Sequence, residues 1–98
     1  MYIKKVKEGN TLVVNVVGRL DTSTAPQMEE ELKDSLEGLD ELIIDCKEVE
    51  YVSSAGLRVL LSTQKKMKGN MKVRNVNEDV NEIFEVTGFS DILNIEVQ

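Results

Sequence analysis

The chain has 98 residues and a formal net charge of −6. This length fits one domain, residues 1–98, and the negative charge argues against a nucleic-acid partner, because phosphate backbones select for clustered Lys and Arg. Histidine is absent, which removes the commonest general base and metal ligand, so we expect no catalytic residue, metal or cofactor.

The composition and the single cysteine indicate a cytoplasmic globular protein. Hydrophobic residues make up 41% of the chain and charged residues 31%, which is typical of soluble domains. Cys46, within an apolar run, is the only cysteine. It is expected to fill space in the core, and a chain without disulfides suits a reducing compartment. We see no secretory leader and no apolar run near the roughly 18 residues of a membrane span, so no membrane insertion is expected.

The first half of the chain predicts a hairpin and a helix. Residues 1–7 and 11–18 read as strands joined by a tight turn, which makes an antiparallel pair. A helix is expected between Thr24, as the first residue of a capping box, and Gly38, as its stop. Its apolar face recurs every four residues, at Met28, Leu32 and Leu36.

The second half alternates strands and helices. Residues 41–46 form a short apolar run, which predicts a strand buried on both faces. A helix ending at Gly69, a strand at 71–76, a helix at 77–88 and a strand at 92–97 follow. The order β-β-α-β-α-β-α-β predicts a single-domain α/β fold with a mixed sheet, in which right-handed crossovers join parallel strands.

Two serines stand where residues 48–52, strand-like in character, pass into the second helix. Ser53 and Ser54 follow directly after this strand, and in α/β sheets ligands and chemistry gather at the carboxyl ends of strands. The simplest interpretation is that Ser54 is an N-cap, which would stabilise the helix by about 1 kcal/mol. The other is that its hydroxyl is a functional site.

Three features favour a functional site. Gly56 and Ala55 are small, so they would leave the backbone around Ser54 uncovered. Arg58 lies one turn further along the same side of the helix. A phosphate on Ser54 would sit at the positive end of the helix dipole. A hydrolase nucleophile is rejected, because its motif needs glycine where Val52 stands and a histidine elsewhere.

A second polar loop leaves a strand and enters a helix at residues 16–26, "VVGRLDTSTAP". Asp21, Thr22 and Ser23 lie within it. Turn and cap chemistry explains the threonines best. Asp21 would contribute to a partner surface beside Ser54 if the two loops share one edge of the sheet.

With these motifs in view, the chain resembles a stand-alone STAS domain, and more narrowly the anti-sigma factor antagonists of that family. The resemblance covers nearly the whole chain. It is most specific in residues 42–61, "LIIDCKEVEYVSSAGLRVLL", and is supported by residues 16–26 and by the closing segment 87–93, "TGFSDIL".

The resemblance implies a switch at one serine. Members of the family bind an anti-sigma factor that is also a serine kinase and so release a sigma factor; the kinase inactivates the antagonist by phosphorylating a serine before a Gly-Leu pair, and a PP2C-type phosphatase reverses this. The pair Gly56-Leu57 puts the phosphorylated serine at Ser54. The family often has Asp before this serine and Ser or Thr after it, where this chain has Ser53 and Ala55. Ser53 is therefore a minor alternative acceptor.

The partner surface is expected to surround Ser54. The residues of this surface are Asp21, Thr22, Ser23, Ser53, Ala55, Gly56 and Arg58. The chain is expected to be a monomer. An alternative is a STAS scaffold or sensor-complex subunit that is never phosphorylated and acts through protein contacts alone, with Ser54 as a cap. A module that binds a small molecule is a third interpretation, although no phosphate-binding loop is present.

Overall fold

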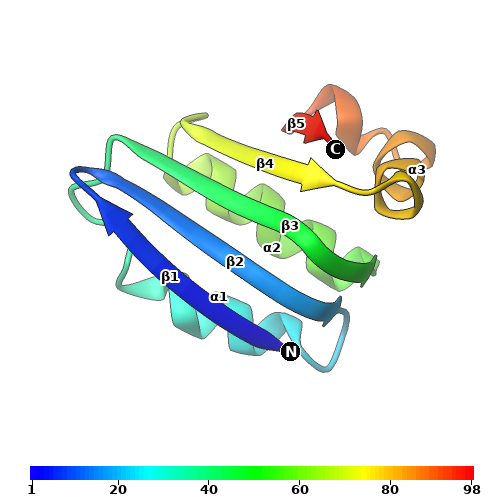
Figure 1. Cartoon of the computed structure of the whole chain (residues 1–98), viewed down its shortest axis with the longest axis horizontal. Coiled ribbons are helices and arrows are strands. Elements are labelled where there is room, and N and C mark those ends of the chain that lie inside the picture. Colours follow the sequence, from blue (N-terminus) through cyan, green and yellow to red (C-terminus); the bar gives the residue numbers. More distant parts are fainter.

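The computed structural model describes all 98 residues as a five-stranded sheet with three α-helices (Figure 1). The strands are β1 (Tyr2–Glu8), β2 (Thr11–Leu20), β3 (Glu41–Val52), β4 (Met71–Val76) and β5 (Asn94–Val97). The helices are α1 (Ala25–Lys33), α2 (Ser54–Lys66), α3 (Glu78–Val86) and a short 3-10 helix, Phe89–Asp91. The predicted element order and the mixed α/β sheet are confirmed.

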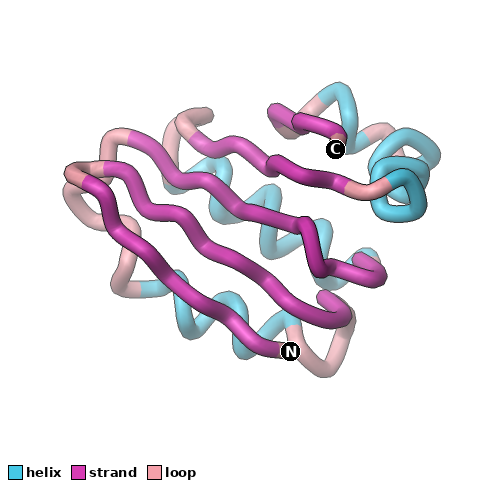
Figure 2. The backbone as a smooth tube through the Cα atoms, in the orientation of Figure 1, coloured by secondary structure: helices cyan, strands magenta, loops and turns pink.

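The strands lie in the sheet in the order in which they occur along the chain, β1-β2-β3-β4-β5. β1 pairs with β2 in the antiparallel sense, and all later pairs are parallel. Successive right-handed crossovers in one direction put their helices on one face of the sheet. Figures 1 and 2 show α1 and α2 together behind the sheet and α3 beyond the end of β4. The opposite face carries no helix.

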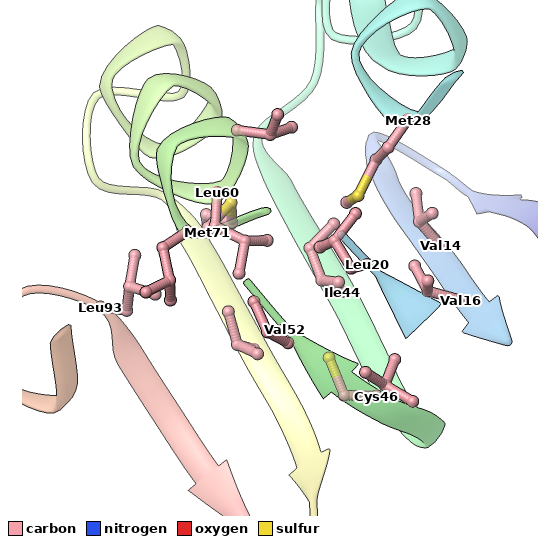
Figure 3. Packing of buried hydrophobic residues seen from close by; sticks show 14 of the residues in the cluster. Val14, Val16, Leu20, Met28, Ile44, Cys46, Val52, Leu60, Met71 and Leu93 are labelled. Carbon is pink, nitrogen blue, oxygen red and sulfur yellow. The ribbon is translucent and has the colours of Figure 1, made fainter. Parts of the chain in front are cut away.

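The core lies between the sheet and the three helices, and α3 contributes Val80 and Phe84 to it. It is one cluster of 22 buried residues, and Figure 3 shows Met28 of α1 pointing toward the strand residues Val14 and Ile44. In β3, buried Ile44 and Cys46 alternate with half-buried residues such as Ile43. The prediction that residues 41–46 are buried on both faces is therefore wrong, because helices cover only one face.

β3 continues past its apolar run to Val52. Its pairing with β2 slips twice, between Asn15 and Val17 and between Gly18 and Arg19. These irregularities are β-bulges, which change the direction in which side chains point. As a result Val49 and Val52 still face the core, and the strand ends directly beside the end of β2.

Two helix boundaries differ from the prediction. α1 ends at Lys33, and Gly38, with φ of 78°, occupies a later turn. Thr24 is the N-cap of α1, but its side chain makes no capping hydrogen bond, so no capping box forms. α2 ends at Lys66, and the amide of Gly69 donates back to the carbonyl of Gln64 at 3.0 Å, which closes the helix as expected.

Candidate functional site

The start of α2 is built by Ser53 rather than by Ser54. Ser53 has extended backbone angles and is the N-cap, and its Oγ accepts a hydrogen bond from the amide of Gly56 at 3.4 Å. Its own amide donates to the carbonyl of Leu20 at 2.9 Å, which ties the end of β3 to the end of β2. The interpretation of Ser54 as the cap is therefore wrong, because the strand geometry extends one residue further than expected.

Ser54 is the first residue of the helix, and its side chain is exposed. Its hydroxyl makes no hydrogen bond within the chain. The first amides of a helix have no partner inside the helix, so they carry a partial positive charge. The structure thus presents an unpaired hydroxyl at a position that favours an added negative charge.

Gly56 has a different role from the one expected. It is buried, and a Cβ at this position would lie 2.7 Å from both the Cγ and the carbonyl oxygen of Leu20 and 3.1 Å from Cγ1 of Val52. Its lack of a side chain lets α2 approach the ends of β2 and β3 closely, rather than uncovering the backbone around Ser54. The expectation for Gly56 is therefore corrected: Gly56 lets the start of α2 pack against Leu20 and Val52, and this packing positions Ser54.

The loop between β2 and α1 is held by its own hydrogen bonds. The carboxylate of Asp21 accepts from the backbone amide and hydroxyl of Ser23, at 3.0 and 2.8 Å, and from the amide of Thr24 at 3.2 Å. The hydroxyl of Thr24 accepts from the amide of Asp21 at 2.8 Å and donates to the carbonyl of Arg19 at 2.7 Å. The Ser23 hydroxyl, followed by the backbone amides, lowers the pKa of Asp21. The loop is a hydrogen-bonded turn with Thr22 and Ser23 exposed at its tip.

This loop and the start of α2 share one edge of the sheet, as the interpretation of Asp21 required. A shallow groove of about 360 Å³ runs between α1 and α2 at this edge. Its lining residues are Thr22, Ala25, Pro26, Glu29, Ala55, Arg58, Val59 and Ser62. The groove brings together three of the expected partner residues, Thr22, Ala55 and Arg58, whereas Asp21, Ser23, Ser53, Ser54 and Gly56 do not line it.

Two residues at the same edge were not singled out from the sequence. The guanidinium of Arg19 lies 4.6 Å from the centre of the Tyr51 ring, and the two residues are direct partners in the pairing of β2 with β3. The Nε of Arg19 also forms an ion pair with Asp21 at 3.5 Å. Only the register of the two bulged strands brings Arg19 and Tyr51 together, so no local pattern could have identified them.

We next consider metal ligands, the cysteine and membrane spans in the rest of the chain. No group of three or more acidic or Cys side chains is arranged to hold a metal ion. Cys46 is buried, and burial together with the negative charge of Asp45 raises the pKa of its thiol to about 12, so it is un-ionised and inert near neutral pH. None of the helices combines the length and the apolar character that a membrane span requires.

The sequence and the fold match known proteins. The family model of the STAS domain matches residues 2–98. The chain belongs to the STAS domain family. This STAS domain is 35% identical over 92 residues to the anti-sigma-B factor antagonist of Bacillus subtilis strain 168, a match that covers 91% of this chain and 84% of that protein. The relative is named as an antagonist of a regulatory factor and not as an enzyme, in agreement with the prediction from the sequence.

Solved structures have the same fold. An anti-sigma factor antagonist from Mycobacterium paratuberculosis superposes with a TM-score of 0.88 at 23% identity, and the match covers 99% of this STAS domain and 86% of that chain. The anti-sigma factor antagonist SpoIIAA in its unphosphorylated form gives a TM-score of 0.81 at 15% identity, covering 96% of this STAS domain and 87% of that chain. The Bacillus cell fate determinant SpoIIAA in its phosphorylated form gives 0.72 at 14% identity, covering 96% and 90%. The predicted resemblance to the STAS family and its anti-sigma factor antagonists is confirmed.

Proposed function

We propose that this STAS domain is an anti-sigma factor antagonist: it binds an anti-sigma factor, which releases a sigma factor, and phosphorylation of Ser54 ends the binding. The observation that carries the proposal is the exposed, unpaired hydroxyl of Ser54 at the start of α2. The chain shares 35% identity with an anti-sigma-B factor antagonist. In this proposal the anti-sigma factor is itself the serine kinase, and a PP2C-type phosphatase restores the hydroxyl.

The surface around Ser54 suits a protein partner. Thr22, at the exposed tip of the loop, and the exposed Arg58 line a groove that is too open to enclose a small molecule. Ser23 is exposed beside Thr22. Asp21, Ser53 and Gly56 take part indirectly, because they hold the loop and the start of α2 in place. A partner that packs on this edge covers the hydroxyl of Ser54, which carries no charge.

Phosphorylation of Ser54 would weaken the binding of the partner through electrostatics alone. A phosphate adds a charge of about −1.5 to −2 at neutral pH. Covering this charge with a surface that lacks matching cations costs several kcal/mol, and a loss of about 1.4 kcal/mol already weakens affinity tenfold. The phosphate does not need to unfold the domain, because the first amides of α2 and the side chain of Arg58, one turn further, offer it favourable charge.

Ser54 is a better acceptor than Ser53. The Oγ of Ser53 is the cap of α2, and Ser53 is only half-exposed. A phosphate there would displace the capping hydrogen bond from the amide of Gly56. Ser54 has neither constraint, so a kinase reaches its hydroxyl without opening the helix.

The test is binding to the anti-sigma factor of the organism from which this chain comes. We expect wild type and Ser54→Ala to bind with similar affinity and Ser54→Asp to lose at least tenfold. The matched control is Ser90→Asp, which adds the same charge at an exposed serine of the 3-10 helix. That helix leads to Ile92, which contacts Gln64 near the far end of α2. Equal binding of Ser54→Asp and wild type would overturn the switch.

Intact-mass measurement with the anti-sigma factor and ATP tests the modification itself. We expect one added phosphate on wild type and Ser53→Ala and none on Ser54→Ala. Binding without any added phosphate would favour the alternative, a constitutive scaffold or sensor-complex subunit of the same fold. In either case the proposal is of a cytoplasmic monomer that contacts proteins, with no nucleic-acid partner and no membrane insertion.

A further inference from the structure

The arginines of this chain are distributed unevenly. There are three, Arg19, Arg58 and Arg74, in a chain with a net charge of −6. Arg74 donates its Nε to the carboxylate of Asp45 at 3.3 Å, in the pairing of β4 with β3. The other two are exposed, and both lie at the edge that carries Ser54. This edge is therefore the place where an acidic chain exposes two of its three guanidinium groups.

Arg19 is held in position but is not satisfied. Its guanidinium stacks on the ring of Tyr51 at 4.6 Å and lies 3.5 Å from Asp21, yet it donates no hydrogen bond within the chain. The carboxylate of Asp21 already accepts three hydrogen bonds from its own loop, so it competes weakly for more. The side chain of Arg19 remains 57% exposed. A guanidinium fixed in this way loses little entropy when it binds an anion.

Tyr51 supplies the apolar part of the same feature. It is one of the few large apolar side chains that the fold leaves exposed, at 37%. The next residue of β3, Val52, is buried against the helices, so the side chain of Tyr51 lies on the opposite, helix-free face of the sheet. Tyr and Arg are the residue types most enriched at the energetic centres of protein interfaces. Neither side chain is needed to fill the core.

The pair lies within reach of one partner seated on Ser54. Tyr51 and Ser54 are three residues apart, so their Cα atoms are separated by at most about 11 Å. Arg19 pairs directly with Tyr51 across the strands. A typical interface covers about 800 Å² on each partner, a disc of roughly 16 Å radius. A protein that covers Ser54 can therefore also reach Arg19 and Tyr51 if its interface extends around the edge of the sheet.

We propose that Arg19, stacked on Tyr51, is a specificity-determining contact that receives an Asp or Glu carboxylate of the partner protein. This inference rests on the proposed function, because it assigns chemistry to the anti-sigma factor that would bind at Ser54. It extends the docking surface from the groove between α1 and α2 around the sheet edge to the ends of β2 and β3. Opposite charge on the partner speeds docking and fixes its register, and an uncharged or basic surface there is rejected.

Binding of the same anti-sigma factor tests the proposal through kinetics and salt dependence. We expect Arg19→Gln to weaken binding about tenfold and Arg19→Glu more, chiefly through the association rate, and the difference from wild type to shrink as salt is raised. Arg19→Lys is expected to retain part of the affinity, because it keeps the charge but loses the planar fork. Tyr51→Ala is expected to weaken binding as well, and Tyr51→Phe is not.

The matched control is Lys7→Glu, which makes the same change of charge at an exposed residue of β1. Lys7 pairs with Leu12 near the opposite end of β2, about 26 Å along the strand from Leu20. We expect it to leave affinity and salt dependence unchanged. The thermal midpoint of every variant is measured alongside, since a pair that only braced the 21–24 loop would change stability and not the salt dependence.

The possible outcomes separate the two proposals. If wild type binds, Ser54→Asp does not, and Arg19→Gln binds with unchanged affinity and salt dependence, the Arg19 contact is refuted and the switch stands. If Arg19→Glu and Lys7→Glu weaken binding equally, only the net charge matters and the contact is again refuted. If wild type does not bind, both proposals fail.

Discussion

Gly56→Ala tests how α2, and with it Ser54, is set against the sheet. An alanine Cβ at this position would lie 2.7 Å from the carbonyl oxygen of Leu20, 2.7 Å from its Cγ and 3.1 Å from Cγ1 of Val52. The Leu20 side chain has other rotamers, but the carbonyl belongs to β2 and accepts a hydrogen bond from the amide of Ser53 at 2.9 Å. The helix itself must move to admit the methyl group.

The magnitude follows from two opposing terms. In a helix without tertiary contacts alanine is favoured over glycine by about 0.8–1.0 kcal/mol. Forcing an extra methyl group into a packed site costs about 1–3 kcal/mol. We therefore expect Gly56→Ala to lower the free energy of unfolding by about 1 kcal/mol, which for a chain of this size corresponds to a fall in Tm of roughly 4–8 °C.

Urea and thermal unfolding measure this change, and a second variant checks its cause. Leu20→Ala removes the Cγ contact, so Gly56→Ala is expected to cost less in that background than in wild type. An equal cost in both backgrounds would mean that the Leu20 side chain plays no part. If Gly56→Ala raised Tm, helix propensity would dominate, and the close approach that positions Ser54 would be refuted.

Three further predictions concern single side chains. Ser53→Ala is expected to lower the free energy of unfolding in urea by about 0.5–1 kcal/mol, because α2 loses its cap, while Ser54→Ala changes it by less than about 0.5 kcal/mol. Cys46, with its pKa raised to about 12, is expected to resist iodoacetamide at pH 8 in the native state and to react in denaturant. Because the unfolded thiol ionises first, stability is complete below about pH 8.5 and falls as pH rises toward the folded pKa. Asp45→Ala is expected to cost about 1–3 kcal/mol, because Arg74 and Asn75 lose their shared acceptor.

Each of these predictions has a contrary result. Equal losses for Ser53→Ala and Ser54→Ala would contradict the assignment of the cap. Rapid alkylation of native Cys46 would mean that the core opens locally. Asp45→Ala with unchanged urea stability would show that the side chain of Asn75, which has a φ of 57°, does not need its 3.1 Å hydrogen bond to hold the end of β4.

The sequence determined the element order and the place of the candidate serine, because both depend on local signals. Periods of two and of nearly four residues distinguish strands from helices without reference to the rest of the chain. The position of Ser53 and Ser54 between such segments identified the strand-to-helix junction. The prediction of the N-cap was wrong by one residue, because Ser53 and not Ser54 is the cap. The rejection of histidine-dependent catalysis needed only the composition.

The tertiary structure decided how distant segments meet. The double slip of β3 against β2 determines that Arg19 lies over Tyr51 and that the carbonyl of Leu20 lies under Gly56. A bulge changes which side of a strand each later side chain faces, and its position depends on packing across the sheet rather than on neighbours in the chain. For the same reason the helix-free face, which leaves Ile43 only half-buried, could not be foreseen from an apolar run alone: burial is a property of what another segment covers.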